Sequence, residues 1–155
     1  MAKLSAGILL YRIKDGEPQV MLVHPGGPFW KNKDLGAWSI PKGEYQIGED
    51  PLEHAKREFK EETGQSAKGK FTRLMPIKQA GGKIVTAFAV AGDLDVSKIK
   101  SNTIPIEWPP KSGKTEQIPE VDRGEWFDLE TARQKINAAQ AAFVDQLEDL
   151  LRKTT

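Results

Sequence analysis

The feature that most constrains this chain is a short, strongly capped helix predicted near its middle, with β-prone segments on both sides. Asp50 is a favoured N-cap residue, Pro51 suits the first helical position, and Glu53 completes a capping pattern. Gly64 is the residue type favoured just beyond a helix end, so we expect the helix over residues 51–62. A lone helix between strand-rich segments buries its apolar side best against a sheet, which favours an α/β fold.

The segments around the helix predict the sheet. Residues 4–13 and 19–24 are β-prone and flank a polar turn, which indicates a hairpin, and residues 71–79 and 83–91 form a second one through Gly81-Gly82. We further expect short strands at 38–40 and 125–127, loops at 25–36, 43–48 and 101–119, and a helical region after Asp128. The prediction is a single domain over residues 1–155, with a mixed sheet covered by helices on both faces.

Composition excludes several classes of partner and site. The 155 residues carry a net charge of +1, so we expect neither nucleic acid nor a membrane as a partner. No apolar run reaches the roughly 20 residues that span a bilayer, and the start lacks the pattern of a signal peptide, which predicts a cytoplasmic protein. The absence of cysteine excludes disulfides, thiolate metal sites and cysteine nucleophiles.

Three glutamates on the predicted helix carry the chemistry. Glu58, Glu61 and Glu62 lie at positions i, i+3 and i+4, which project to one side of a helix. Clustered carboxylates repel one another, and Mg²⁺ or Mn²⁺ relieves that repulsion because hard cations prefer oxygen ligands. Arg57 can hold a neighbouring carboxylate in place, and the negative charge of Glu49 is favoured before the helix N-terminus.

The spacing of these residues resembles a known family signature. Gly43, five residues, Glu49, seven residues and then Arg57-Glu58-Phe59-Lys60-Glu61-Glu62-Thr63-Gly64 are similar to the Nudix box. One departure is Gln65, which stands where the family usually has an aliphatic residue. The resemblance implies an α/β/α sandwich with the box as a loop–helix–loop. It also implies an enzyme that uses water and a divalent metal to hydrolyse a phosphoanhydride bond in a nucleotide-type substrate.

The resemblance also implies roles for particular residues. Glu58, Glu61 and Glu62 would bind the metal, Mg²⁺ or Mn²⁺, with help from the backbone carbonyl of Lys42. Arg57 would orient a glutamate, and Glu49 would support the loop or bind metal through water. Glu61 is our first choice for the general base, because it has close carboxylate neighbours. Glu116 and Glu120, near the proline-rich segment, are the remote candidates, although ordinary exposed acids are the default expectation for both.

Residues before the box suggest a substrate class. The run from Trp38 to Glu44, WSIPKGE, looks like the entry to the box in dinucleoside tetraphosphate hydrolases, where a lysine such as Lys42 contacts substrate phosphate. Phe29 or Trp30 could stack on a nucleobase, and Lys31 or Lys33 could meet phosphates, unless the loop aromatics pack only on one another.

Other substrates and one other class of protein stay open. The alternatives are nucleoside triphosphates, including oxidised ones, inositol pyrophosphates, and nucleotide sugars such as ADP-ribose, the last weakened because no proline stands out at the usual distance after the box. A non-catalytic nucleotide sensor with this fold is the alternative from another class, and the chain could be a monomer or a homodimer. His24 and His54 are too few for a zinc site, and His54 is expected on the helix surface.

Overall fold

A seven-stranded mixed sheet forms the centre of the computed structural model, which describes residues 3–153. The main path runs β4 (Thr72–Arg73), β6 (Ile84–Ala91), β1 (Leu4–Lys14), β2 (Glu17–Pro25) and β9 (Val121–Asp128), while β3 (Lys42–Tyr45) pairs with β1 and β5 (Ile77–Lys78) with β6. Strands β1 and β6 are parallel, whereas β1 and β2 form the predicted antiparallel hairpin. The predicted mixed sheet is therefore confirmed.

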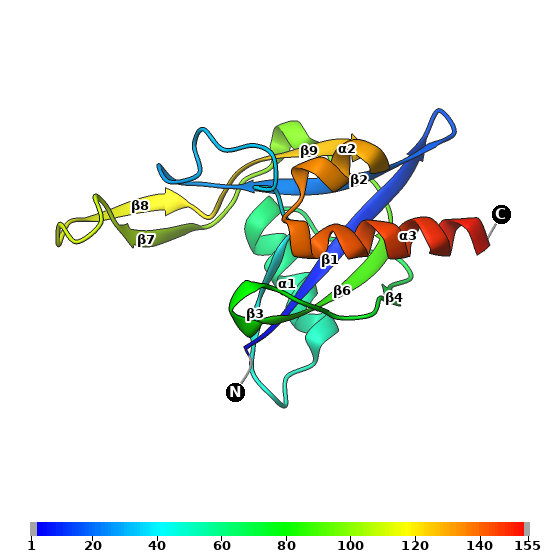
Figure 1. Ribbon diagram of the computed structural model, residues 1–155, viewed down its shortest axis with the longest axis horizontal. Coiled ribbons are helices and arrows are strands. Elements are labelled where there is room, and N and C mark those ends of the chain that lie inside the picture. Colours follow the sequence, from blue (N-terminus) through cyan, green and yellow to red (C-terminus); the bar gives the residue numbers. More distant parts are fainter. Residues whose placement is uncertain (1–2, 154–155) are drawn as a thin grey trace.

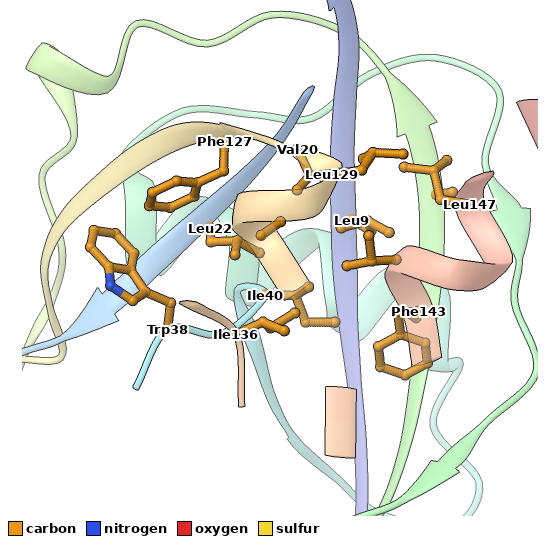
Figure 2. Packing of buried hydrophobic residues seen from close by; sticks show 14 of the residues in the cluster. Leu9, Val20, Leu22, Trp38, Ile40, Phe127, Leu129, Ile136, Phe143 and Leu147 are labelled. Atoms are coloured by element: carbon orange, nitrogen blue, oxygen red, sulfur yellow. The ribbon is translucent and has the colours of Figure 1, made fainter. Parts of the chain in front are cut away.

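Helices cover both faces of this sheet (Figure 1). Helix α1 (Pro51–Thr63) packs on one face, and α2 (Leu129–Lys135) with α3 (Ala141–Lys153) covers the other. Along β1, Leu9 belongs to the core under α3, whereas its neighbours Ile8 and Leu10 belong to the core under α1. Figure 2 shows Leu9 close to Phe143 and Leu147 in the first of these cores. This α/β/α arrangement confirms the predicted fold class.

Helix α1 has the predicted caps. The Asp50 carboxylate accepts from the Leu52 N–H at 3.0 Å, and Gly64 ends the helix in the left-handed region with φ 77°. Ala55 and Phe59 are fully buried against the sheet. The loop predicted at 43–48 is wrong at its start, because residues 42–45 pair with β1 as strand β3. The box glycine is thus part of the sheet.

Two predicted strands are shorter than expected. Residues 71–79 form two short strands, β4 and β5, against β6, because Met75 and Pro76 leave the sheet and the Met75 N–H donates to Gln146 instead. Residues 38–40 form isolated bridges, Val23 with Ser39 and Trp38 with Ile136, in place of a strand. The hairpin through Gly81-Gly82 is confirmed, since β5 and β6 pair across it.

The prediction of a loop over residues 101–119 is wrong, because most of this segment forms two paired strands. Strands β7 (Thr103–Glu107) and β8 (Thr115–Pro119) form a separate antiparallel hairpin, here called the arm, that extends away from the main sheet (Figure 1). Ile104 and Ile106 alternate with exposed residues, which is a strand pattern. Pro105 and Pro119 are tolerated because each strand of a two-stranded ribbon has one unpaired edge. The arm leads directly into β9.

The C-terminal helical region begins where it was predicted. Asp128 caps α2 by accepting from the Thr131 N–H at 2.7 Å, but α2 ends before Ile136 and a second helix, α3, follows. None of the helices within residues 3–153 is long and apolar enough to cross a membrane.

Candidate active site

Three carboxylates converge where the last turns of α1 meet the start of β9. One oxygen from each of Glu58, Glu62 and Glu120 lies within 4.8 Å of the others. Glu62 is only 4% exposed, while Glu58 and Glu120 are half-buried. Among the described residues, Glu62 Oε2 has no hydrogen-bond partner although it is fully buried. A buried acceptor without a partner is costly, so this cluster calls for a ligand that supplies positive charge.

Burial and mutual repulsion raise the pKa values of two of these acids. Burial is the largest cause for Glu62, followed by Glu120 and Glu58, and raises its pKa to about 9. Burial, with Glu61 and Glu120, raises the pKa of Glu58 to about 7. A divalent cation would reverse both effects, since carboxylate oxygens are the donors that Mg²⁺ and Mn²⁺ prefer. The residues present therefore fit the implied metal.

Lys42 brings a positive charge to the same place. A cleft of about 160 Å³ is lined by Val23, Pro25, Ser39, Ile40, Lys42, Glu62, Glu120 and Val121. Burial lowers the pKa of the Lys42 ammonium, with a contribution from Lys83, while Glu62 and Glu120 act in the opposite direction. The predicted phosphate-contacting lysine thus lines a cleft together with two of the clustered carboxylates.

Glu61 lies apart from this cluster, although it was predicted to bind metal with Glu58 and Glu62. Its side chain is exposed and lines a different, open hollow of about 700 Å³ on the outer side of α1, together with Glu53, Lys56, Arg57, Lys60, Ser66, Ala67 and Lys68. Helix geometry explains the separation: at about 100° per residue, Glu62 points about 40° from Glu58 toward the sheet, whereas Glu61 points about 60° the other way.

Arg57 on α1 contacts Glu49 in the loop before that helix. An Arg57 Nη2 atom lies 3.6 Å from Glu49 Oε2, and Glu49 Oε1 accepts from the Gln46 N–H at 2.8 Å. Arg57 therefore pairs with Glu49 and not directly with a clustered carboxylate. The contacts of Glu49 correspond to the loop-supporting role among the two that were expected.

The indication from the sequence was weakest for Glu120, which was expected by default to be an ordinary exposed acid. Its backbone is held on both sides: its N–H donates to the Asn102 carbonyl at 3.0 Å, and its carbonyl accepts from the Gly26 N–H at 3.0 Å. The Asn102 N–H in turn donates to the Glu61 carbonyl at 2.8 Å, which ties the bend carrying Glu120, between β8 and β9, to the last turn of α1 through Asn102. Glu116, the other remote candidate, is exposed on β8.

The aromatic loop before the box is ordered by contacts of its own. Phe29 is 55% exposed, and its ring meets Trp30 edge-on with centroids 5.0 Å apart. Lys33 places its ammonium 3.5 Å from the centre of the Phe29 ring, whereas Lys31 is exposed. Buried His24 anchors the loop, with Nε2 at 2.6 Å from the Lys33 carbonyl oxygen. Phe29 thus presents a supported aromatic surface to solvent.

Comparisons with known proteins agree with this architecture. The family model described as NUDIX domain matches residues 1–147. A binary complex of C. elegans Ap4A hydrolase is 22% identical, with a TM-score of 0.65 over 98% of this chain and 99% of that one. The NUDIX domain of Shewanella oneidensis NrtR, complexed with ADP ribose, is 17% identical, with a TM-score of 0.64 over 97% and 89% of the two chains.

A mutT/nudix family protein from Listeria innocua has a similar fold. It is 14% identical, with a TM-score of 0.64 over 98% of this chain and 95% of that chain. At these identities the structural likeness shows a shared fold. No protein of curated function matches this sequence.

Proposed function

Because this chain belongs to the NUDIX domain family, we propose that it is a divalent-metal-dependent pyrophosphohydrolase that cuts a phosphoanhydride bond with water. The observation that supports this most strongly is the convergence of Glu58, Glu62 and Glu120 within 4.8 Å, beside Lys42, in a partly buried cleft. Three carboxylates held together in a partly buried place are costly to keep, which favours an enzyme over a sensor that only binds nucleotides.

In this proposal a few residues share the tasks of the site. Glu58, Glu62 and Glu120 hold Mg²⁺ or Mn²⁺, with the Lys42 carbonyl as a further ligand. When bound, the metal neutralises phosphate charge and makes a coordinated water more acidic. The Lys42 ammonium contacts a substrate phosphate as a point charge, and the Glu49–Arg57 pair supports the loop before α1.

Two residues are candidates for the general base. Glu61 remains one, because it is exposed and lies in the same helical turn as Glu62. Glu120 is the other, since its carboxylate already lies within 4.8 Å of Glu58 and Glu62. A base must reach the water that it deprotonates, so the geometry favours Glu120.

We propose a dinucleoside tetraphosphate as the substrate. The WSIPKGE run and the similarity to C. elegans Ap4A hydrolase support this choice. The exposed Phe29 ring, backed by Trp30 and Lys33, is a candidate surface for stacking a nucleobase, and Lys31 is free to meet distal phosphates. A cytoplasmic location, and a monomeric or homodimeric state, are further parts of the proposal.

The test is hydrolysis of diadenosine tetraphosphate, ATP and ADP-ribose with Mg²⁺ in isotopically labelled water. Chromatography then separates the products, and the position of the label shows which phosphorus water attacks. We expect diadenosine tetraphosphate to be cleaved fastest, and Glu58→Gln or Glu62→Gln to lower kcat by about 10²-fold or more. Glu53→Gln is the matched control, because Glu53 lies on the same helix, is exposed, and pairs with Lys56.

The same panel separates the alternatives. Faster cleavage of ATP or ADP-ribose than of diadenosine tetraphosphate would change the proposed substrate class without changing the reaction. If wild type and variants alike bound nucleotides tightly but released no product, the protein would be a nucleotide sensor and not an enzyme.

A further inference from the structure

His54 is buried beside the carboxylate cluster, although it was expected on the helix surface. The residue is 8% exposed, and its ring lies 5.9 Å from the ring of Tyr45 on β3. It precedes Glu58 by four residues, so the two side chains lie one above the other on α1. Burial against β3 gives this histidine a fixed position next to Glu58.

The two ring nitrogens of His54 have different surroundings. Arg57 Nη2 lies 3.2 Å from Nδ1. A guanidinium can only donate, so Nδ1 is the acceptor in this contact and the ring hydrogen is on Nε2. Arg57 is itself held by Glu49 at 3.6 Å. The Glu49–Arg57 pair therefore selects the tautomer of His54.

The Nε2–H of His54 faces Glu58. Glu58 Oε1 lies 3.5 Å from Nε2, and among the described residues Nε2 has no hydrogen-bond partner although it is shielded from solvent. A buried donor without a partner is rare, and a carboxylate oxygen within reach is the natural acceptor. The separation of 3.5 Å is at the limit of a hydrogen bond, so the pairing requires the Glu58 carboxyl group to turn toward Nε2.

We infer that His54 is a positioning residue: its Nε2–H engages one oxygen of Glu58 and leaves the other oxygen directed to the metal. This inference rests on the proposed function for the metal, and it adds a residue outside the box signature. It also explains how Arg57 acts on a metal-binding glutamate without touching one, through the chain Glu49–Arg57–His54–Glu58. Groups that orient ligands in this way typically contribute about 10- to 100-fold in metal affinity.

Two substitutions separate the two nitrogens. His54→Gln keeps an N–H near the position of Nε2, whereas His54→Asn keeps a polar atom only near Nδ1. We expect His54→Asn to weaken Mn²⁺ binding, measured by electron paramagnetic resonance without substrate, by about tenfold or more, and His54→Gln to restore most of it. Both variants lose the ring, so equal loss in both would show a packing role and overturn the inference.

The tautomer is measurable in the wild-type protein, independently of any variant. Nitrogen-15 NMR of the metal-free protein should show His54 with a pyrrole-type Nε2 and a pyridine-type Nδ1. The opposite tautomer would overturn the His54–Glu58 pairing whatever the metal does. If the protein showed the expected tautomer but bound no Mn²⁺, the proposed metal site would be wrong, and the positioning role with it. The hydrogen-bond geometry between His54 and Glu58 would still be supported.

Discussion

The side chain of Glu58 occupies the space that a side chain at residue 43 would need. A Cβ built on Gly43 would lie 2.2 Å from the Glu58 carboxyl carbon and 2.6 Å from its Oε1. Because β3 pairs with β1, Gly43 cannot move away without disturbing the sheet. The glycine at the start of the box is therefore required by the carboxylate that crosses it, and this carboxylate lies between Gly43 on the strand side and His54 on the helix side.

Gly43→Ala should damage the site more than the fold. The added methyl group must displace the Glu58 carboxyl group, so we expect Mn²⁺ affinity and kcat to fall by about tenfold or more. The measurements are Mn²⁺ titration and steady-state hydrolysis, with thermal unfolding as the check on folding.

Gly16→Ala is the control with the opposite signature. Gly16 has a φ of 82° in the β1–β2 turn, and a Cβ there meets nothing within 4 Å. The left-handed backbone costs an alanine roughly 1–2 kcal/mol, so the Tm should fall while Mn²⁺ affinity stays unchanged. Equal metal affinity in Gly43→Ala and wild type would contradict the proposed confinement of Glu58.

The stability of the metal-free protein should fall as the pH rises. Burial raises the pKa of Glu62 to about 9 and that of Glu58 to about 7, from 4.5. Between 4.5 and these values the folded protein keeps protons that the unfolded chain releases, so the free energy of unfolding decreases with pH. The proposed Mg²⁺ ion would bind the ionised carboxylates, so Mg²⁺ should raise Tm most at the alkaline end of the range.

Glu62→Gln isolates this effect from other titrating groups. The amide cannot ionise, so the metal-free variant should gain Tm relative to wild type as the pH rises from about 4.5 toward about 9, and it should gain less from Mg²⁺. Thermal unfolding in chelator and in Mg²⁺ across this range measures both differences. A Tm difference between variant and wild type that is constant with pH would contradict the raised pKa of Glu62.

Features of the site that depend on neighbouring residues could be predicted from the sequence, whereas features that depend on long-range packing could not. The caps at Asp50 and Gly64 and the positions of Glu58 and Glu62 follow from contacts within a few residues, and the structure has them where they were predicted. Spacing alone placed Glu61 in the same group, because positions i+3 and i+4 are both neighbours of i. The sheet decides between them, since it lies on the side of Glu62.

Glu120 could not be found in this way. Its approach to α1 depends on backbone hydrogen bonds from residues 26 and 102, which no local pattern reports. The four prolines of segment 101–119 favoured a loop over the arm, but Pro105 and Pro119 lie within its two strands, and the other two lie in the turn between them. His54 was misplaced for a similar reason, because the aromatic residue that covers it comes from β3.

Glu120→Gln and Glu116→Gln should behave differently, although both glutamates lie close together in sequence. Glu120 is within 4.8 Å of Glu58 and Glu62, whereas Glu116 is exposed on the arm. We expect Glu120→Gln to lower kcat by about 10²-fold and Glu116→Gln to leave it unchanged, measured by steady-state hydrolysis. Comparable kcat in the two variants would remove Glu120 from the proposed machinery and return the general-base role to Glu61.

Ser101→Ala should loosen Glu120 without touching the site itself. The Ser101 hydroxyl accepts from the Val121 N–H at 3.0 Å and donates to the Asn102 carbonyl at 2.8 Å, the same carbonyl that holds the Glu120 N–H. Loss of the hydroxyl leaves the Val121 N–H without its partner, at a cost of about 1 kcal/mol in stability. Because this bond lies next to Glu120, kcat should fall by about tenfold with little change in KM.

Two further variants decide whether the position of Glu120 is responsible for that loss. Ser101→Thr keeps the hydroxyl and should recover most of kcat. Ser112→Ala removes a hydroxyl that likewise accepts a backbone N–H, from Lys114 at 3.1 Å, but at the tip of the arm, and it should leave kcat unchanged. Steady-state kinetics and thermal unfolding on all three proteins separate the cases. If Ser101→Ala lost stability as expected but kept full kcat, Glu120 would be held by the backbone bonds to Asn102 and Gly26 alone.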